Sequence, residues 1–249
     1  MEANENLRAK LVFEGSYDYF KKGHIYAEEK FQVYKDQKVY DHIFISELLS
    51  RTNTGEMLKI NTDYEISKDW IPQTIKIKKR LGEKEASESF YYDRKNNIVQ
   101  YKFVSNEKKT ESRITTAPRF HVSTPTAASS MLFILAKRFD ATARNDYGVI
   151  SSFNQWKYVE PPRTQNISLE RVSVGNEVMI VNDQELSCVK YRILETVKFS
   201  DQNMRKDQKV PHPPLMVYLS NHLAIPYIRE GEDGSRVQIK FLKDIESES

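Results

Sequence analysis

The chain has 249 residues, of which 39% are hydrophobic and 29% are charged, so it has enough apolar side chains to form a core and is not expected to be disordered. The 38 basic and 35 acidic side chains leave a formal charge of only +3, which argues against a nucleic-acid-binding surface. The one cysteine, Cys188, excludes an internal disulfide and a cysteine-based metal site.

The first half of the chain alternates apolar and polar residues in short segments, and polar turn residues separate the segments. This period-two pattern predicts β-strands, and the short turns predict antiparallel pairing of neighbours. The predicted strands of this meander, within residues 10–116, are Lys10–Phe20, Ile25–Val33, Val39–Ser50, Met57–Ser67, Gln73–Leu81, Glu88–Asp93, Ile98–Ser105 and Thr110–Thr116.

A different pattern begins at Ser123, where a hydroxyl residue and Pro125 together resemble the start of a helix. Ala128, Met131, Leu132, Leu135 and Phe139 then fall on one helical stripe. We therefore expect one α-helix over residues 124–139, packed against or inside the concave face of the sheet. It either fills one end of the core or borders a ligand cavity.

Strand patterns return in the second half, within residues 147–242. The predicted strands are Tyr147–Phe153, Trp156–Val159, Ile167–Val174, Val178–Val181, Leu186–Phe199, Leu215–Ser220, Ile225–Glu230 and Val237–Leu242. The proline-rich run Ser200–Pro214 is expected to be a long loop. Nothing in the composition marks a domain boundary, so we expect one β-rich domain over residues 1–249. No window is apolar enough to predict a transmembrane segment.

Motifs that would name a reaction are lacking. The sequence has no phosphate-binding glycine loop, zincin motif or nucleophile elbow, and its five histidines are far apart. No cofactor and no metal site are therefore predicted.

Arg119 and His121 form the most suggestive polar pair. They fall on one side of an extended segment that leads directly into the expected helix. A helix start offers free amide donors, so this corner suits the anionic head group of a ligand. The alternative is a solvated arginine and a hydrogen-bonded histidine.

A second cluster follows the expected helix and contains Asp146, Tyr147, Trp156, Tyr158 and Glu160. Its aromatic rings could line the opposite wall of a cavity. With His121 as the proton carrier and Asp146 or Glu160 as its partner, acid/base chemistry is conceivable. Packing of the rings in the core is the competing interpretation.

The layout also resembles a known family. The segments that carry the resemblance are Gly15-Ser16-Tyr17, the helix opened by Thr124-Pro125, and Met216–His222 followed by Ile225–Ile228. Together they look like a family of bacterial exported β-rich proteins of unknown function. The resemblance implies a strongly curved sheet around a helix, similar to lipoprotein carriers and lipocalin-like proteins, with a hydrophobic ligand and a periplasmic location.

We therefore expect a mostly β protein, a curved antiparallel sheet or open barrel around one buried α-helix. Its expected function is to bind or carry a hydrophobic or amphiphilic small molecule. Arg119 and His121 would hold the polar end, and Met131, Leu135, Tyr147, Trp156 and Tyr158 would contact the rest. Two alternatives stay open. One is a cofactor-independent lyase, hydratase or isomerase that acts on an apolar substrate in the same cavity, and the other is a structural envelope or interaction protein without a ligand site, for which an envelope protein is the expected partner. A cytoplasmic location is the alternative to the periplasm.

Overall fold

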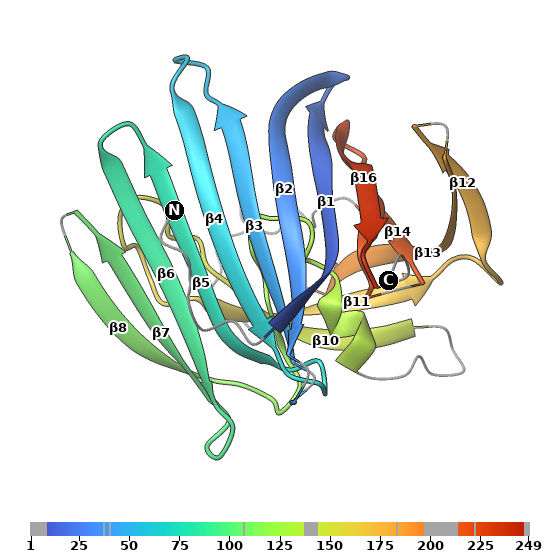
Figure 1. Ribbon diagram of the computed structural model, residues 1–249. Helices are drawn as coiled ribbons and strands as arrows, with labels where there is room; N and C mark the ends of the chain where they lie inside the picture. The colour runs from blue at the N-terminus through green and yellow to red at the C-terminus, as the bar shows by residue number, and fades with distance from the viewer. Residues whose placement is uncertain are drawn as a thin grey trace.

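The computed structural model describes residues 9–36, 38–39, 41–106, 108–136, 144–182, 184–196, 214–221 and 223–246. Strands dominate the described residues (Figure 1). They are β1 (Ala9–Lys21), β2 (His24–Asp36), β3 (His42–Arg51), β4 (Met57–Ile66), β5 (Pro72–Leu81), β6 (Lys84–Asp93), β7 (Ile98–Ser105), β8 (Lys109–Thr115), β9 (His121–Val122), β10 (Arg144–Ser151), β11 (Arg163–Arg171), β12 (Glu177–Val181), β13 (Gln184–Thr196), β14 (Leu215–Ser220), β15 (Pro226–Gly231) and β16 (Ser235–Asp244).

All sixteen strands belong to one curved, unclosed sheet, which confirms the predicted mostly β, open architecture. Its order is β8-β7-β6-β5-β4-β3-β2-β1-β16-β15-β14-β13-β11-β10-β9, and β12 pairs with β13 outside this path. The first eight strands form the predicted meander, each antiparallel to the next. The last strand, β16, returns to pair with β1, so the two halves of the chain share one sheet.

The two faces of the meander differ as the alternation predicts. In β2, Ala27, Glu29, Phe31 and Val33 are buried on the concave face, and the residues between them are exposed or half-buried. The largest fully buried side chains of the meander are Tyr17, Phe44, Tyr64, Ile66, Ile75, Phe90, Tyr101 and Phe103. Aromatic and β-branched side chains thus fill the concave side, while Lys and Glu dominate the convex one.

Gly15 on β1 lies where the neighbouring strands β2 and β16 leave no room for a side chain. A Cβ built at this position would lie 2.6 Å from the Phe31 ring and 2.7 Å from the carbonyl oxygen of Phe241. The pairing of β1 with β16 shifts register directly afterwards, between Ser16 and Tyr17. A residue without a side chain therefore lets three strands pack tightly at the bend of the sheet.

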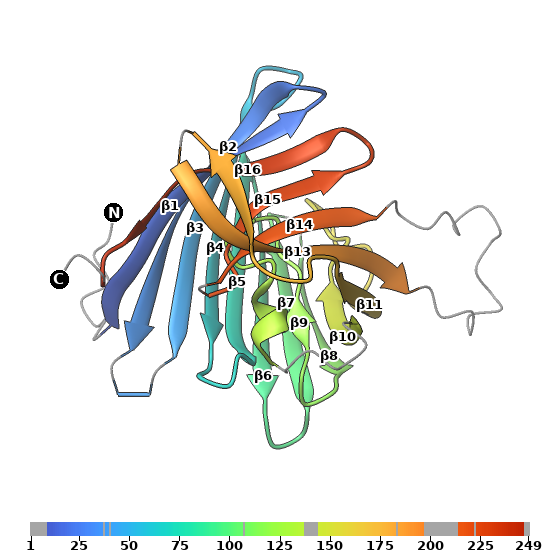
Figure 2. The ribbon, with the colours of Figure 1, turned by 90° about the vertical axis from the view of Figure 1, so that its right-hand side faces the viewer.

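Two connections, which we call the covering segments, lie on the concave face: residues 116–136 and residues 152–162. Hydrogen bonds to side chains of the sheet hold them there. The amides of Ala127 and Ala128 donate to the Glu29 carboxylate, and Lys79 donates to the carbonyl oxygen of Asn154. Figure 2 shows the first of them between the meander and the strands β10, β11 and β13, which cross opposite it. The sheet therefore curls around its own connections.

The α-helix predicted over residues 124–139 is wrong. Residues 128–131 form turns and Leu132–Ala136 form a short 3-10 helix, η1, while residues 137–139 lie outside the described part. The backbone bonds that the structure shows here join each residue to the one three positions earlier: the amide of Ser130 donates to the carbonyl oxygen of Ala127, and the amide of Ile134 donates to that of Met131. Bonds of this spacing give turns and a 3-10 helix, whereas an α-helix needs bonds to the residue four positions earlier.

The apolar stripe nevertheless reaches a core, as the pattern indicated. Met131, Phe133 and Ile134 pack in a second cluster whose other members come from β10, β11 and β14, namely Tyr147, Leu169, Val217, Leu219 and Ala224 beside β14. Leu132, Ala127 and Ala128 pack instead with the meander. The segment is thus buried between the two halves of the sheet, because its apolar side chains point in several directions and pack against both halves.

One predicted strand is also wrong. Residues 156–159 form no strand, since a bend at 155–157 is followed by irregular backbone. The side chain of Asn154 binds amides that a strand would pair, those of Val159 and Glu160. Most of the predicted loop over residues 200–214 lies outside the described residues.

Candidate ligand-binding cleft

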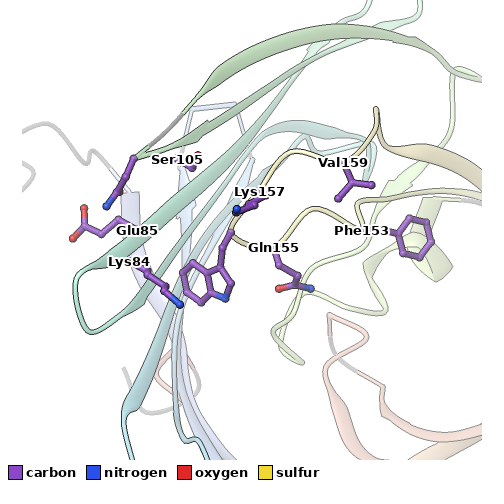
Figure 3. Close-up of a pocket in the computed structure, with 9 residues that line it drawn as sticks. Lys84, Glu85, Ser105, Phe153, Gln155, Lys157 and Val159 are labelled. Atoms are coloured by element: carbon purple, nitrogen blue, oxygen red, sulfur yellow. The ribbon is translucent and has the colours of Figure 1, made fainter. Parts of the chain in front are cut away.

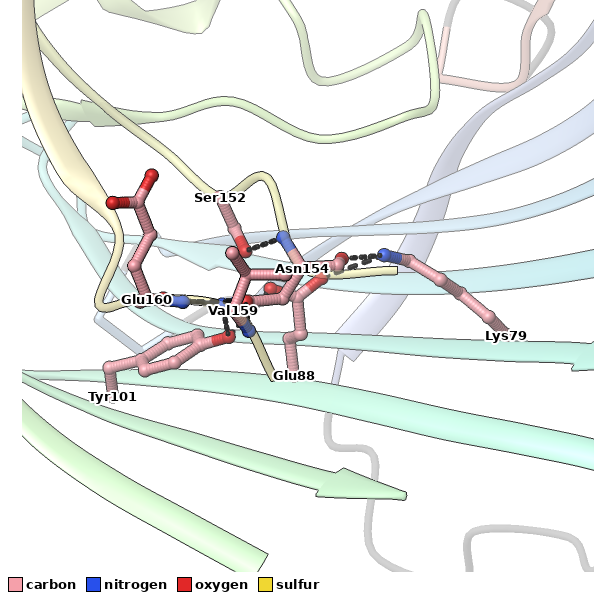
Figure 4. Close-up of polar contacts among 7 residues, drawn as sticks. All are labelled: Lys79, Glu88, Tyr101, Ser152, Asn154, Val159 and Glu160. Carbon is pink, nitrogen blue, oxygen red and sulfur yellow. Dashed lines mark hydrogen bonds and ion pairs between the residues drawn. The ribbon is translucent and has the colours of Figure 1, made fainter. Parts of the chain in front are cut away.

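The second covering segment is fastened by Asn154, which is 1% exposed. Its side-chain oxygen accepts hydrogen bonds from the amides of Val159 at 2.7 Å and Glu160 at 3.3 Å. Its side-chain nitrogen donates to the Tyr101 hydroxyl at 3.0 Å and to the carbonyl oxygen of Glu160 at 2.8 Å (Figure 4). One side chain therefore closes residues 154–160 into a compact loop and ties that loop to β7.

A buried ion pair on β5 and β6 also holds this loop against the sheet. Lys79 Nζ lies 2.8 Å from Glu88 Oε2 and donates to the carbonyl oxygen of Asn154 at 2.9 Å. The Tyr101 hydroxyl donates to the other oxygen of Glu88 at 2.8 Å. Burial and the neighbouring carboxylate raise the pKa of Tyr101, so it stays a donor. Both charges are thus paired and hydrogen-bonded, which offsets the cost of burying them.

The fastened loop forms one wall of a cleft of about 430 Å³ at the rim of the sheet, which we call the rim cleft. The opposite wall comes from the start of β6 and the end of β7. The lining residues are Lys84, Glu85, Ser105, Asn106, Phe153, Gln155, Trp156, Lys157 and Val159. In Figure 3, Lys84 and Glu85 lie across from Phe153, Gln155 and Val159.

The rim cleft combines apolar walls with charged lips. Phe153 and Val159 are 51% and 72% exposed, although apolar side chains of this size are usually buried. Lys84 and Lys157 stand at its opening. A cleft of this volume with exposed apolar walls is the kind of place where small molecules bind.

Of the residues predicted to contact a ligand, Trp156 lines the rim cleft and Tyr158 does not. The Tyr158 ring lies 6.0 Å from the Phe103 ring, and Lys108 Nζ stands 5.4 Å from its centre. Tyr158 therefore supports the loop from the core side.

Three other predicted residues meet in a second, smaller cleft. Arg119, Asp146 and Tyr147 line a space of about 210 Å³ together with Phe120, Phe133, Ala136 and Gly148. The Ser168 hydroxyl donates a hydrogen bond to Asp146. The structure thus brings Arg119 together with Asp146 and Tyr147, from either side of the 124–139 segment, although no α-helix start lies beside them.

His121 is buried behind this smaller cleft and does not line it. Its Nδ1 is hydrogen-bonded to the Tyr64 hydroxyl at 2.9 Å, and its Nε2 has no partner among the described residues. Its ring packs against the rings of Tyr64 and Phe133. Burial lowers the pKa of His121 to about 3, so the imidazole is neutral and only weakly basic at neutral pH.

The residues predicted to assist His121 lie elsewhere. Neither of its ring nitrogens is bound by Asp146 or Glu160, and the carboxylate of Glu160 pairs with Arg163 instead. Met131 is packed in the second core cluster, and Leu135 is 36% exposed on η1. The acid/base pair is therefore not assembled in this structure.

Sequence reasoning missed Lys79, Glu88 and Asn154. A signal was present, because Lys79 follows Ile75 and Ile77 on one face of β5, and Glu88 precedes Phe90 on one face of β6. An inward lysine and an inward glutamate in neighbouring strands indicate a buried ion pair. The role of Asn154 had no such pattern, because a loop has no periodicity.

Two other kinds of site are absent from the described part of the chain. Within it, no three His, Cys, Asp or Glu side chains gather as they would around a metal ion. No helix there has the length and apolar character needed to cross a bilayer.

One curved, unclosed sheet around its own connections defines a β-barrel-like protein. A crystal structure with this description, a protein of a domain of unknown function (DUF1849) from Brucella abortus, is similar to the chain with a TM-score of 0.58 and 10% sequence identity, covering 95% of this chain and 99% of that one. A protein of the DUF1089 family from Pseudomonas aeruginosa has a TM-score of 0.48 and 7% identity, over 81% and 88% of the two chains. The first likeness shows the fold alone. No family model matches the sequence, and no curated protein does.

Proposed function

We propose that the protein binds or carries an amphiphilic small molecule, in the manner of lipocalin-like carriers, and that the apolar part of the ligand lies in the rim cleft. The observation that carries the proposal is the exposure of Phe153 and Val159 on a loop that buried hydrogen bonds hold in place. A fastened loop does not collapse over its apolar side chains, so they stay available to a ligand at a low entropic cost.

The proposal places the ligand at the edge of the concave face rather than at its centre. At the centre, Tyr64, Phe90 and Tyr101 are fully buried beneath the covering segments. We also propose a periplasmic location, which rests on the family resemblance and which cell fractionation tests.

Intrinsic fluorescence gives a direct test, because the chain has two tryptophans and only Trp156 lines the rim cleft. In a Trp70→Phe background, titration with alkyl maltosides of 8 to 12 carbons, below their micelle concentrations, should change Trp156 emission saturably. Native mass spectrometry of the freshly purified protein should show whether a ligand is retained.

Two matched variants locate the binding site. Val159→Asp adds a charge to the rim cleft and should weaken binding at least tenfold, or about 1.4 kcal/mol. Val178→Asp is the control, since Val178 is 68% exposed on β12 and does not line the cleft. Absence of saturable binding, or an equal effect of the two substitutions, would refute the proposed function.

A further inference from the structure

A second hollow, which we call the convex groove, lies on the outer face of β4 to β7 and has a volume of about 580 Å³. Its floor follows from the register of the strands. Asn61 pairs with Lys78, Lys78 with Ser87, and Ser87 with Val104, so short side chains from three strands share one row with a single lysine. The remaining lining residues are Lys59, Lys79, Arg80, Glu85, Ala86, Ser105 and Asn106.

Positive charge dominates the convex groove. Four cationic residues and one carboxylate line it. Three of the cations are paired: Lys79 with Glu88 on the concave side, Lys59 with Glu47, and Arg80 with Glu85 at 3.8 Å. Lys78 has no hydrogen bond or ion pair within the part of the chain that the structure describes. This groove therefore has an unpaired cation in its middle, between the amide of Asn61 and the hydroxyl of Ser87.

The convex groove and the rim cleft share a wall. Glu85, Ser105 and Asn106 line both of them, and Lys84 at the lip of the rim cleft is the neighbour of Glu85 in the chain. An apolar cleft and a cationic groove thus meet at the ends of β6 and β7. A molecule lying across that wall would have an apolar environment at one end and a cationic one at the other.

We propose that the convex groove binds the phosphate-type head group of the amphiphile whose apolar part occupies the rim cleft, an inference that rests on the proposed function. A phosphate ester presents several acceptor oxygens and a negative charge, which matches a lysine flanked by an amide and a hydroxyl. The ligand is then an anionic amphiphile such as an alkyl phosphate or a phospholipid, rather than a neutral lipid.

The experiment compares three probes by titration of Trp156 emission and by calorimetry: dodecyl phosphate, dodecyl maltoside below its micelle concentration, and inorganic phosphate. We expect dodecyl phosphate to bind at least tenfold more tightly than dodecyl maltoside, and the difference to shrink as salt increases. Inorganic phosphate alone should bind more weakly than dodecyl phosphate, because it lacks the apolar part.

Two lysines on one strand provide the matched pair. Lys78→Gln should weaken dodecyl phosphate about tenfold and leave dodecyl maltoside unchanged. Lys76→Gln should change neither, since Lys76 lies two residues away on the same exposed face and outside the groove.

The outcomes separate the two proposals. If both amphiphiles bind equally well, or if the two lysine variants behave alike, the head-group inference is overturned while the rim cleft stands. Inorganic phosphate binding as tightly as dodecyl phosphate would also overturn it, since the ligand would then be a free phosphate. If neither amphiphile binds, the proposed function itself fails.

Discussion

Single buried polar side chains have clear physical consequences in this protein, and His121 is the plainest case. It is 2% exposed, and it forms its one described hydrogen bond with Tyr64. Burial lowers its pKa to about 3, below the ordinary value of 6.5. Between those two pH values the unfolded chain binds a proton at this position and the folded protein does not, so stability falls as the pH falls through that window.

Replacing His121 should therefore make the protein less sensitive to acid. We expect the loss of unfolding free energy between pH 7 and pH 4.5 to be smaller in His121→Phe than in the native protein by about 2 to 3 kcal/mol. Urea unfolding of both proteins at the two pH values measures this difference. Equal losses in the two proteins would mean that His121 titrates normally in the folded state.

At the scale of elements, a single buried carboxylate fastens the first covering segment to the sheet. Glu29 on β2 accepts hydrogen bonds from the Tyr19 hydroxyl and from the amides of Ala127 at 2.7 Å and Ala128 at 3.2 Å. Burial raises the pKa of Glu29, and these hydrogen bonds oppose that rise. Glu29 thus joins a local turn to a strand that lies almost a hundred residues earlier.

Glu29→Ala should leave these donors without acceptors and lower the unfolding free energy by about 2 to 4 kcal/mol. Hydrogen exchange at the amides of Ala127 and Ala128 should accelerate more than exchange in β3. Glu28→Ala is the matched control, because Glu28 is the neighbour of Glu29 in the chain and its side chain is 58% exposed on the convex face. This substitution should change the unfolding free energy by no more than about 0.5 kcal/mol. Similar destabilisation by both changes would contradict the role given to Glu29.

At the scale of the whole molecule, the sheet curls without closing and therefore has edges. β8 pairs with β7 on one side and ends the strand order. Its outward side chains are charged, Lys109, Glu111 and Arg113, and all three are exposed. Charged side chains on an edge strand oppose pairing with another molecule.

Removing those charges should allow molecules to associate through their edges. The triple variant Lys109→Val, Glu111→Val, Arg113→Val should form dimers or larger species in size-exclusion chromatography with light scattering. The control places three valines in one row of the central convex face, at Asp63, Lys76 and Ser89. If both triple variants associate equally, added apolar surface rather than the open edge is responsible.

Only part of the candidate site could be predicted from the sequence. The residues on strands follow a local pattern, whereas the residues on loops and the register between strands do not. Alternation places Lys79 and Glu88 on inward faces, so their ion pair was open to discovery once β5 and β6 were recognised as neighbours. Trp156 lines the rim cleft, but it does so from an irregular connection rather than from the strand that the alternation predicted. The convex groove depends on how four neighbouring strands are aligned with one another. A shift of one residue in that alignment would place different side chains in the same row.

The amino-acid sequence by itself determined most of the strands, the meander and the inward and outward faces, because period-two alternation is a local property that burial on one side enforces. It also marked the apolar stripe that includes Ala128, Met131 and Leu132 as buried. Only the tertiary structure decided that this segment forms turns and a short 3-10 helix, since its amides bind Glu29 of β2 and its apolar side chains pack against both halves of the sheet. The rim cleft likewise depends on Asn154 meeting Tyr101 and Lys79, contacts between residues far apart in the chain that no local pattern encodes.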